Sequence, residues 1–117
     1  MFPIADCLFC KIIAGEIPSA KVYEDETAYA FRDINPMAPT HVLVVPKKHV
    51  ASMAEIDQAD DALLAGCLRA VREVAKLEGV DATGYRVVSN CGDDACQSVK
   101  HLHFHVLGGR KMNESMA

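Results

Sequence analysis

The segment from His101 to Leu107 alternates histidine with apolar residues, and no other feature of the chain constrains the fold as strongly. Side chains on a β-strand point alternately to opposite faces of a sheet, so a strand here would separate the two kinds of residue. We expect the apolar face to pack into a core and the imidazoles to line a surface or cleft. The apolar face would carry Leu102, Phe104 and Val106, and the other face His101, His103 and His105.

The longest periodic segment, residues 60–78, predicts a helix. Its apolar residues recur at steps of three and four, which places them on one helical face. They are Leu63, Leu64, Cys67, Leu68, Val71, Val74 and Ala75. Asp60 or Asp57 would cap the first turn, and Gly79 would supply the left-handed residue that ends the helix.

Shorter runs predict the rest of the chain, starting with a short helix at residues 8–14. Strands are expected at residues 20–24, 28–33, 41–45, 85–90 and 101–107. The polar or proline-rich segments between them, at 25–27, 35–39 and 91–100, would form turns and loops. Because strands and helices do not alternate regularly, we expect an α+β fold with a mostly antiparallel sheet. A length of 117 residues predicts a single domain over residues 1–117.

Composition narrows the classes of function. The formal net charge of −4 argues against wrapping a nucleic-acid polymer, although a single nucleotide needs only a local anion site. No stretch approaches the roughly 20 apolar residues that span a bilayer, so we expect no membrane segment. The first residues lack the basic and long apolar regions of a signal peptide. With five cysteines in no framework spacing, these features favour the reducing cytoplasm.

Three imidazoles on one face of a strand suit two kinds of chemistry. They can bind a metal such as zinc, or one can act as a nucleophile or acid–base group while its neighbours position an anion. The polar loop of residues 92–98 runs directly into the histidines, where its backbone N–H groups could cradle a phosphate. The residues alone leave both possibilities open.

Longer stretches resemble the histidine triad (HIT) family, and in particular its branch of purine nucleoside phosphoramidases. Residues 97–110, QSVKHLHFHVLGGR, resemble the family signature His-φ-His-φ-His-φ-φ, in which φ is an apolar residue. Residues 9–18 and 33–49 agree with the family in the same register, so the resemblance extends from about residue 7 to residue 111. It implies a five-stranded antiparallel sheet with two helices, in a homodimer whose two sheets join into one.

The resemblance also implies roles for individual residues. His103 would attack the α-phosphate of a purine nucleotide and form a covalent nucleotidyl-histidine, with His101, His105 and Ser98 assisting. Asp33 would accept hydrogen bonds from the ribose hydroxyls, and apolar side chains would hold the base. The implied nucleotide contacts are Phe9, Ile17, Phe31, Asp33, Ile34, Asn90, Gln97, Ser98, His103 and His105.

Cys7 and Cys10 form a Cys-x-x-Cys pair, whose spacing suits a metal ion or a redox pair. The surrounding pattern lacks the strand–helix–strand unit typical of redox domains. The family resemblance implies zinc, held by Cys7, Cys10, His49 and His101. Four protein ligands leave no open coordination position, so this zinc would be structural. No organic cofactor is implied.

The expected function is hydrolysis of purine nucleoside 5′-phosphoramidates or related acyl nucleotides. Three alternatives stay open: cleavage of dinucleoside polyphosphates, nucleotide binding with weak catalysis, and a zinc-binding protein in which all three histidines hold metal. Two departures from the common family pattern bear on this choice. Ala95-Cys96 stands where many members carry Gly-Gly, and residues 112–117 lack the aromatic residue and prolines of some members. The sequence therefore does not define the leaving group.

Overall fold

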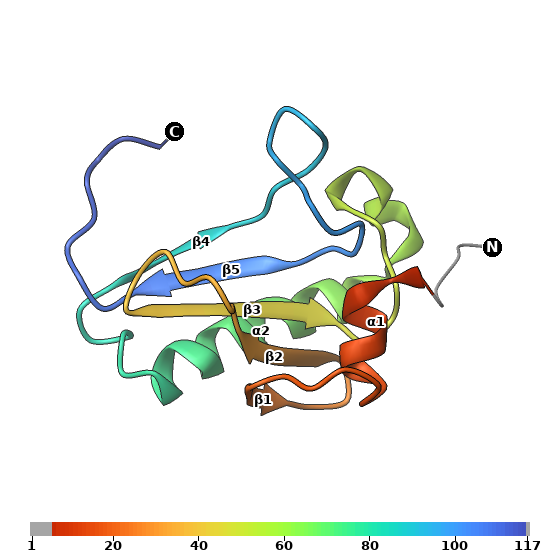
Figure 1. Ribbon diagram of the computed structural model, residues 1–117, viewed down its shortest axis with the longest axis horizontal. Helices are drawn as coiled ribbons and strands as arrows, with labels where there is room; N and C mark the ends of the chain where they lie inside the picture. The colour runs from red at the N-terminus through yellow and green to blue at the C-terminus, as the bar shows by residue number, and fades with distance from the viewer. Residues whose placement is uncertain (1–5, 117) are drawn as a thin grey trace.

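A five-stranded antiparallel sheet with one helix on each face forms the frame of the protein (Figure 1). The computed structural model describes residues 6–116, and the expectation about a signal peptide falls largely on residues 1–5, outside this range. The elements are α1 (Leu8–Ile13), β1 (Lys21–Glu24), β2 (Ala28–Arg32), β3 (Thr40–Pro46), η2 (Met53–Gln58), α2 (Asp61–Leu77), β4 (Tyr85–Val88) and β5 (Phe104–Gly108). The sheet order β1-β2-β3-β5-β4, antiparallel throughout, confirms the predicted α+β fold.

Helix α2 covers one face of the sheet, as its apolar periodicity predicts. The Asp60 side chain accepts a hydrogen bond from the backbone N–H of Leu63 at 2.8 Å, and Gly79 follows the helix with a φ of 73°. Both predicted helix ends are confirmed. Leu68 is an exception to the predicted apolar face, because 58% of it is exposed. The core between α2 and the sheet includes Cys67, Ala70, Val71, Val74, Leu102, Phe104 and Val106.

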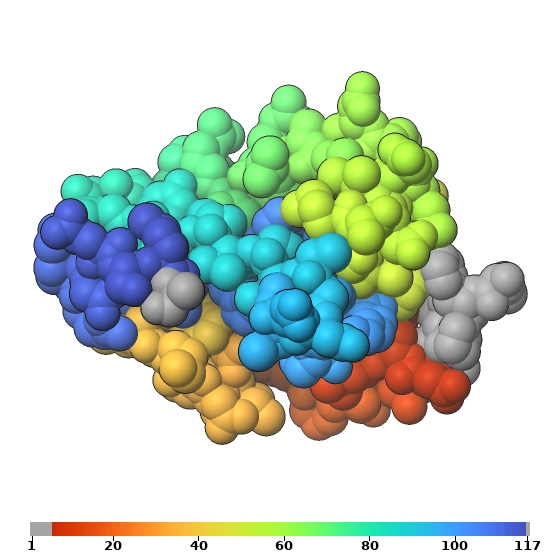
Figure 2. All heavy atoms as spheres, turned by 90° about the horizontal axis from the view of Figure 1, so that it is seen from above, coloured from red at the N-terminus to blue at the C-terminus, as the bar shows by residue number. Residues whose placement is uncertain are grey.

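Helix α1 packs on the opposite face, over one half of the sheet. Its buried residues Phe9 and Ile12 join Phe31 of β2 and Leu43 of β3 in a second apolar cluster. Figure 2, viewed from above the sheet edge, shows residues of α2 in green and residues of α1 in red on opposite sides of the molecule. Among residues 6–116, no helix covers the other half of this face, where β5 and β4 lie (Figure 1).

Strand β5 begins at Phe104, three residues later than the alternating pattern predicts. The register pairs Val44 with Phe104, which places Pro46 opposite Leu102. Proline has no N–H to continue the ladder, so the chain leaves the sheet here and the Leu102 N–H donates to the Val50 carbonyl at 2.6 Å. Strand β4 likewise ends two residues before the predicted limit, at Val88.

The 3₁₀-helix η2 was not predicted, because it is short and buries no side chain that could produce a periodic apolar signal. The Ser52 side chain caps it by accepting from the Ala54 N–H at 3.1 Å. None of the helices in residues 6–116 combines the length and the apolar character needed to cross a membrane.

Candidate active site and metal centre

Two of the three imidazoles are buried, which corrects for them the expectation that the imidazoles line a surface or cleft. His101 is fully buried and His103 is 5% exposed, whereas His105 is half-buried. The ring of Phe9 on α1 covers the first two, with its centroid 6.0 Å from that of His101 and 5.2 Å from that of His103. Helix α1 therefore covers these two histidines.

His103 is oriented as a nucleophile would need to be. Its Nδ1 lies 2.7 Å from the carbonyl oxygen of His101. A carbonyl can only accept, so Nδ1 carries the proton and Nε2 keeps its lone pair. Burial lowers the pKa of His103, which favours this neutral form.

A fourth histidine, His41 on β3, fixes the opposite tautomer in His105. The backbone N–H of Met37 donates to Nδ1 of His41 at 3.0 Å, so the proton of His41 is on Nε2. That Nε2 lies 2.9 Å from Nδ1 of His105 and donates to it. His105 is left with an N–H at Nε2, ready to donate. Sequence reasoning missed this role of His41, because nothing in the sequence shows that β3 and β5 pair side by side.

His41, His105 and Asp33 also lie close enough together to suggest a metal site, since their ligand atoms fall within 4.8 Å of one another. The hydrogen bond from the Met37 amide argues against it. A metal at Nε2 of His41 would require the ring proton on Nδ1, where it would face the amide proton. Asp33 instead accepts from the Asn35 N–H at 2.8 Å through Oδ1, while its Oδ2 lies 3.5 Å from Nε2 of His41.

The burial of these imidazoles predicts a fold that weakens in acid. Burial lowers the pKa of His41, and burial together with the neighbouring His103 and His41 lowers the pKa of His105 to about 4. An unfolded histidine titrates near 6.5, so between about pH 6.5 and 4 the unfolded chain binds more protons than the folded one. We expect the free energy of unfolding to fall by on the order of 2 kcal/mol across this window from His105 alone.

Urea unfolding at several pH values between 4 and 7.5 measures this dependence. The variant His105→Gln should show a shallower slope of stability against pH than the parent, whatever its absolute stability. Arg69→Gln, on the exposed side of α2, should keep the parent slope. Equal slopes in the parent and in His105→Gln would contradict the expectation.

The loop of residues 92–98 is a closed turn with an unusual residue at its end. The N–H of Gln97 donates to the Gly92 carbonyl at 3.1 Å, and the N–H of Cys96 donates to the Asp93 carbonyl at 3.0 Å. This pattern is a Schellman turn, in which the next-to-last residue has a left-handed conformation. That residue is Cys96, with a φ of 62°, at a position that favours glycine.

Gln97 holds this loop in place with its side chain. Its Oε1 accepts from the Gly92 N–H at 3.0 Å, and its Nε2 donates to the carbonyls of Ala51 and Val99 at 2.8 and 3.0 Å. Both amide protons are therefore used within the protein. The side chains of Asn90 and Ser98 have no hydrogen-bond partner among residues 6–116, so their polar atoms are available to a ligand.

The four apolar residues implied to hold a base do not all lie together. Phe9 and Phe31 pack edge to face with centroids 5.4 Å apart, and Ile17 packs against the same cluster. Ile34 is 91% exposed on the loop after Asp33. Three of the four residues thus belong to one largely buried apolar cluster, which contacts His103 through Phe9, and Ile34 is exposed to solvent.

The predicted zinc ligands converge on one point beneath α1. Sγ of Cys7 and Sγ of Cys10 lie 3.3 and 3.5 Å from Nδ1 of His101, and Sγ of Cys10 lies 3.3 Å from Nδ1 of His49. All four ligand atoms are within 4.8 Å of one another. In a tetrahedral site with usual zinc–sulfur and zinc–nitrogen bond lengths, such edges measure about 3.6 Å. The four residues form a closed Cys₂His₂ set that supports a structural zinc ion.

The protonation of the cluster also fits a metal. Nε2 of His101 lies 2.8 Å from the Pro46 carbonyl oxygen, so it donates there and Nδ1 presents a lone pair to the two sulfur atoms. Without a metal, burial raises the pKa of Cys10 to about 12, so this residue is a thiol. Zinc binding would displace its proton.

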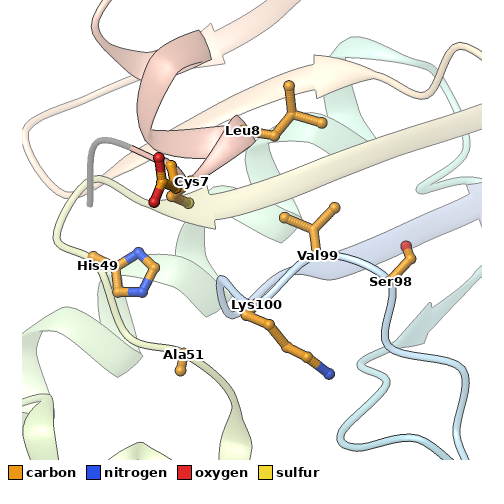
Figure 3. Close-up of a pocket in the computed structure, with 8 residues that line it drawn as sticks. Cys7, Leu8, His49, Ala51, Ser98, Val99 and Lys100 are labelled. Carbon is orange, nitrogen blue, oxygen red and sulfur yellow. The ribbon is translucent and has the colours of Figure 1, made fainter. Parts of the chain in front are cut away.

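A cavity of about 530 Å³ lies on the metal side of this arrangement (Figure 3). Cys7, Leu8 and His49 line it on one side, and Ser98, Val99 and Lys100 line it on the other. His103 and His105 do not border it. Ser98 is therefore the catalytic candidate that adjoins this cavity, and the histidine face over β5 and β4 is a separate surface.

Comparisons with known proteins agree with this architecture. Residues 14–112 match the HIT domain family, a range that excludes Cys7, Phe9 and Cys10. A 14 kDa zinc-binding protein from Zea mays is 51% identical over 108 residues, covering 91% of this chain and 84% of the relative. A HIT family hydrolase from Clostridium thermocellum superposes with a TM-score of 0.91 at 46% identity, covering 96% of this chain and 97% of its own.

A more distant structure extends the comparison. The histidine triad nucleotide-binding protein from Candida albicans superposes with a TM-score of 0.80 at 37% identity, covering 96% of this chain and 87% of its own. The match to the family therefore includes both the sequence around the histidines and the sheet that carries them. On the match over residues 14–112 and the identity with its relatives, this chain belongs to the HIT domain family.

Proposed function

We propose that the protein hydrolyses purine nucleoside 5′-phosphoramidates and related acyl nucleotides, with His103 as the nucleophile. The observation that carries the proposal is the pair of opposite tautomers on neighbouring imidazoles. His103 presents a lone pair at Nε2, and His105 presents an N–H at Nε2. One group can attack a phosphorus atom while the other donates to a phosphoryl oxygen or to the leaving group.

The reaction would proceed in two displacements. Nε2 of His103 attacks the α-phosphorus in line and forms an N–P bond, while the P–N bond to the amine breaks and the amine leaves with the proton that Nε2 of His105 donates. Water then attacks the nucleotidyl-histidine and gives a proton back to Nε2 of His105, and the nucleoside monophosphate is released with His103 restored. Dividing one difficult displacement into two easier ones is the usual advantage of covalent catalysis.

Residues around His103 would stabilise charge on the phosphate. The side chain of Asn90, after β4, and that of Ser98, at the end of the loop that Gln97 supports, are unpaired among residues 6–116, and they would donate to phosphate oxygens. Removing one such donor typically slows a reaction by about 10²-fold to 10³-fold. In the alternative in which all three histidines bind metal, the proton of His105 would have to move from Nε2 to Nδ1, which would break the hydrogen bond that Nδ1 accepts from His41.

The nucleoside would lie toward α1. The cluster of Phe9, Phe31 and Ile17 contacts His103 through Phe9, and a purine would bind against the edge of this cluster. Ile34 would close over the purine from the loop. Asp33 keeps lone pairs on Oδ2 beyond its bond to Asn35, and it would accept from the ribose hydroxyls. Relatives described as a hydrolase and as a nucleotide-binding protein support this assignment.

The direct test is release of AMP from adenosine 5′-phosphoramidate at neutral pH by the purified protein. Turnover would support the reaction class. Turnover of dinucleoside polyphosphates alone would replace the proposal with the polyphosphate reaction, and tight AMP binding without turnover of either would leave a binding protein.

The need for reduced Cys7 and Cys10 as zinc ligands supports a location in the cytoplasm.

We also propose that the chain forms a homodimer through strand β4. The two sheet edges differ in character: β1 carries Lys21 and Glu24, whereas β4 exposes the apolar residues Tyr85 and Val87. An apolar edge with unpaired backbone groups is a template for pairing with another strand, and charged residues discourage it. Leu68 on α2, 58% exposed, would add apolar surface to the same interface.

Placing a charge on this edge should separate the subunits. In the variant Val87→Asp, a carboxylate would be buried in the interface, so we expect a monomer at micromolar concentration by sedimentation equilibrium, where the parent is a dimer. Met53→Asp is a matched control, because Met53 is 38% exposed and Val87 41% exposed. A dimer that persists in Val87→Asp, or a monomeric parent, would contradict the proposal.

A further inference from the structure

Three cationic side chains gather at one end of the uncovered sheet face. Arg86 on β4 and Arg110 after β5 both line two adjoining cavities, each about 210 Å³ in volume. Lys111 lines the second of them. Among residues 6–116, no carboxylate lines either cavity and none of the three cations pairs with an acidic group. In a chain of net charge −4, this is a local excess of positive charge.

The strand register places Arg86 of this cluster on the same face as the proposed catalytic histidines. Arg86 pairs with Leu107, and Leu107 pairs with His41. Directly paired residues of antiparallel strands share a face, and His105 shares it too because it precedes Leu107 by two residues. From the usual spacing within and between strands, the Cα atoms of Arg86 and His105 are about 8 Å apart.

Backbone carbonyls from two segments hold both guanidinium groups in place. Nη2 of Arg110 donates to the Met37 carbonyl at 3.2 Å, the residue whose N–H orients His41. Nη2 of Arg86 donates to the Asn113 carbonyl at 2.9 Å. Figure 2 shows the C-terminal segment in dark blue against the teal residues of β4 and above the orange loop of residues 34–39. Each guanidinium has five N–H donors, so several remain after these bonds.

The geometry of the proposed displacement directs the leaving group toward this cluster. In an in-line displacement the leaving group departs on the side opposite the nucleophile. His103 lies against Phe9 of α1, so a phosphorus atom beside His105 would expel its leaving group away from α1. Along β5 that direction leads to Leu107, and across to β4 it leads to Arg86.

We propose that Arg86 and Arg110 form a subsite for an anionic group on the leaving group of the substrate. The inference rests on the proposed function and names its substrate class: nucleoside phosphoramidates whose amine carries a carboxylate or a phosphate a few bonds from the nitrogen. Both anions have oxygen atoms that a guanidinium can bind in pairs, which is stronger than neutral hydrogen bonding.

Three substrates of similar length test the inference. AMP amides of β-alanine, of 2-aminoethyl phosphate and of propylamine offer a carboxylate, a phosphate and no charge in the same place. We expect the parent to prefer at least one anionic amide over the neutral one by about tenfold in kcat/KM. The carboxylate and phosphate arms then show which anion the subsite accepts.

The selectivity ratio, anionic over neutral, is the readout in the variants. It should fall toward one in Arg86→Gln and in Arg110→Gln, and it should stay at the parent value in Arg69→Gln, on α2 behind the sheet. Because the ratio compares two substrates on one protein, general damage to the fold cancels. An unchanged ratio in both arginine variants would overturn the proposal.

Lys100 is an alternative binding residue for the anionic group, since it lines the 530 Å³ cavity together with Ser98. Loss of the anionic preference in Lys100→Gln, with retention in Arg86→Gln, would place the leaving group in that cavity and overturn the subsite. If the parent hydrolyses none of the three amides, the proposed hydrolytic function is wrong, but the subsite can still be tested by calorimetric binding of the same compounds. Tighter binding of an anionic amide that is lost in Arg86→Gln would support the subsite. Equal binding of the anionic and neutral amides would overturn it.

Discussion

Replacing His103 with alanine is expected to lower the rate of AMP release from adenosine 5′-phosphoramidate by at least about 10⁴-fold, the size of effect seen when a covalent nucleophile is removed. The remaining groups could still bind the nucleotide, but no other side chain presents a lone pair in the same place. His105 cannot substitute, because its Nδ1 accepts from His41 and its Nε2 carries the proton.

Steady-state kinetics and acid-quench mass spectrometry measure this effect together. The parent should accumulate a nucleotidyl adduct on a peptide containing His103, and the alanine variant should show none. His105→Ala is the informative comparison, because it removes a donor rather than the nucleophile and should slow the reaction by about 10²-fold to 10³-fold. A His103→Ala variant that folds and retains more than one per cent of the parent rate would exclude His103 as the nucleophile.

Local sequence patterns predict the elements of this fold well where one physical effect dominates. The bounds of α2 agree within one residue at each end with those predicted from the apolar period of residues 60–78, the Asp60 cap and Gly79. The start of β5 was wrong, because it depends on which residue of β3 stands opposite. Only the register shows that Pro46 faces Leu102 and ends the ladder. The alternation of residues within one strand carries no information about the strand that pairs with it.

In the site, too, local patterns predict some features, and others depend on contacts between distant segments. The alternation placed His101, His103 and His105 on one side of the chain, and the structure keeps Leu102, Phe104 and Val106 on the other. The burial of His103 and the tautomer of His105 come from segments far away in the sequence, α1 and the Met37 amide. The tautomer of His103 is set by the carbonyl of His101, two residues away. His41 shows the consequence most clearly, since its role appears only when β3 and β5 are paired.

Removing zinc is expected to affect stability and catalysis together, because His101 belongs to both sites. Its ring faces Cys7 and Cys10 at Nδ1, and its backbone carbonyl accepts the proton that orients His103. Loss of the metal would leave α1 held mainly by its apolar contacts and would free this carbonyl to shift. We expect the double variant Cys7→Ser/Cys10→Ser to unfold at least about 10 °C lower than the parent and to react about 10-fold to 100-fold more slowly.

Metal analysis, thermal unfolding and AMP release on the same samples separate the possible outcomes. The parent should contain one zinc ion per chain, and the double variant none. Cys91→Ser is the matched control, because Cys91 is exposed and lies outside the cluster, so it should keep the metal, the melting temperature and the rate. A metal-free double variant that melts and reacts like the parent would show that the apolar contacts of Phe9 and Ile12 alone hold α1 against the histidines, and that the His101 carbonyl needs no metal to orient His103.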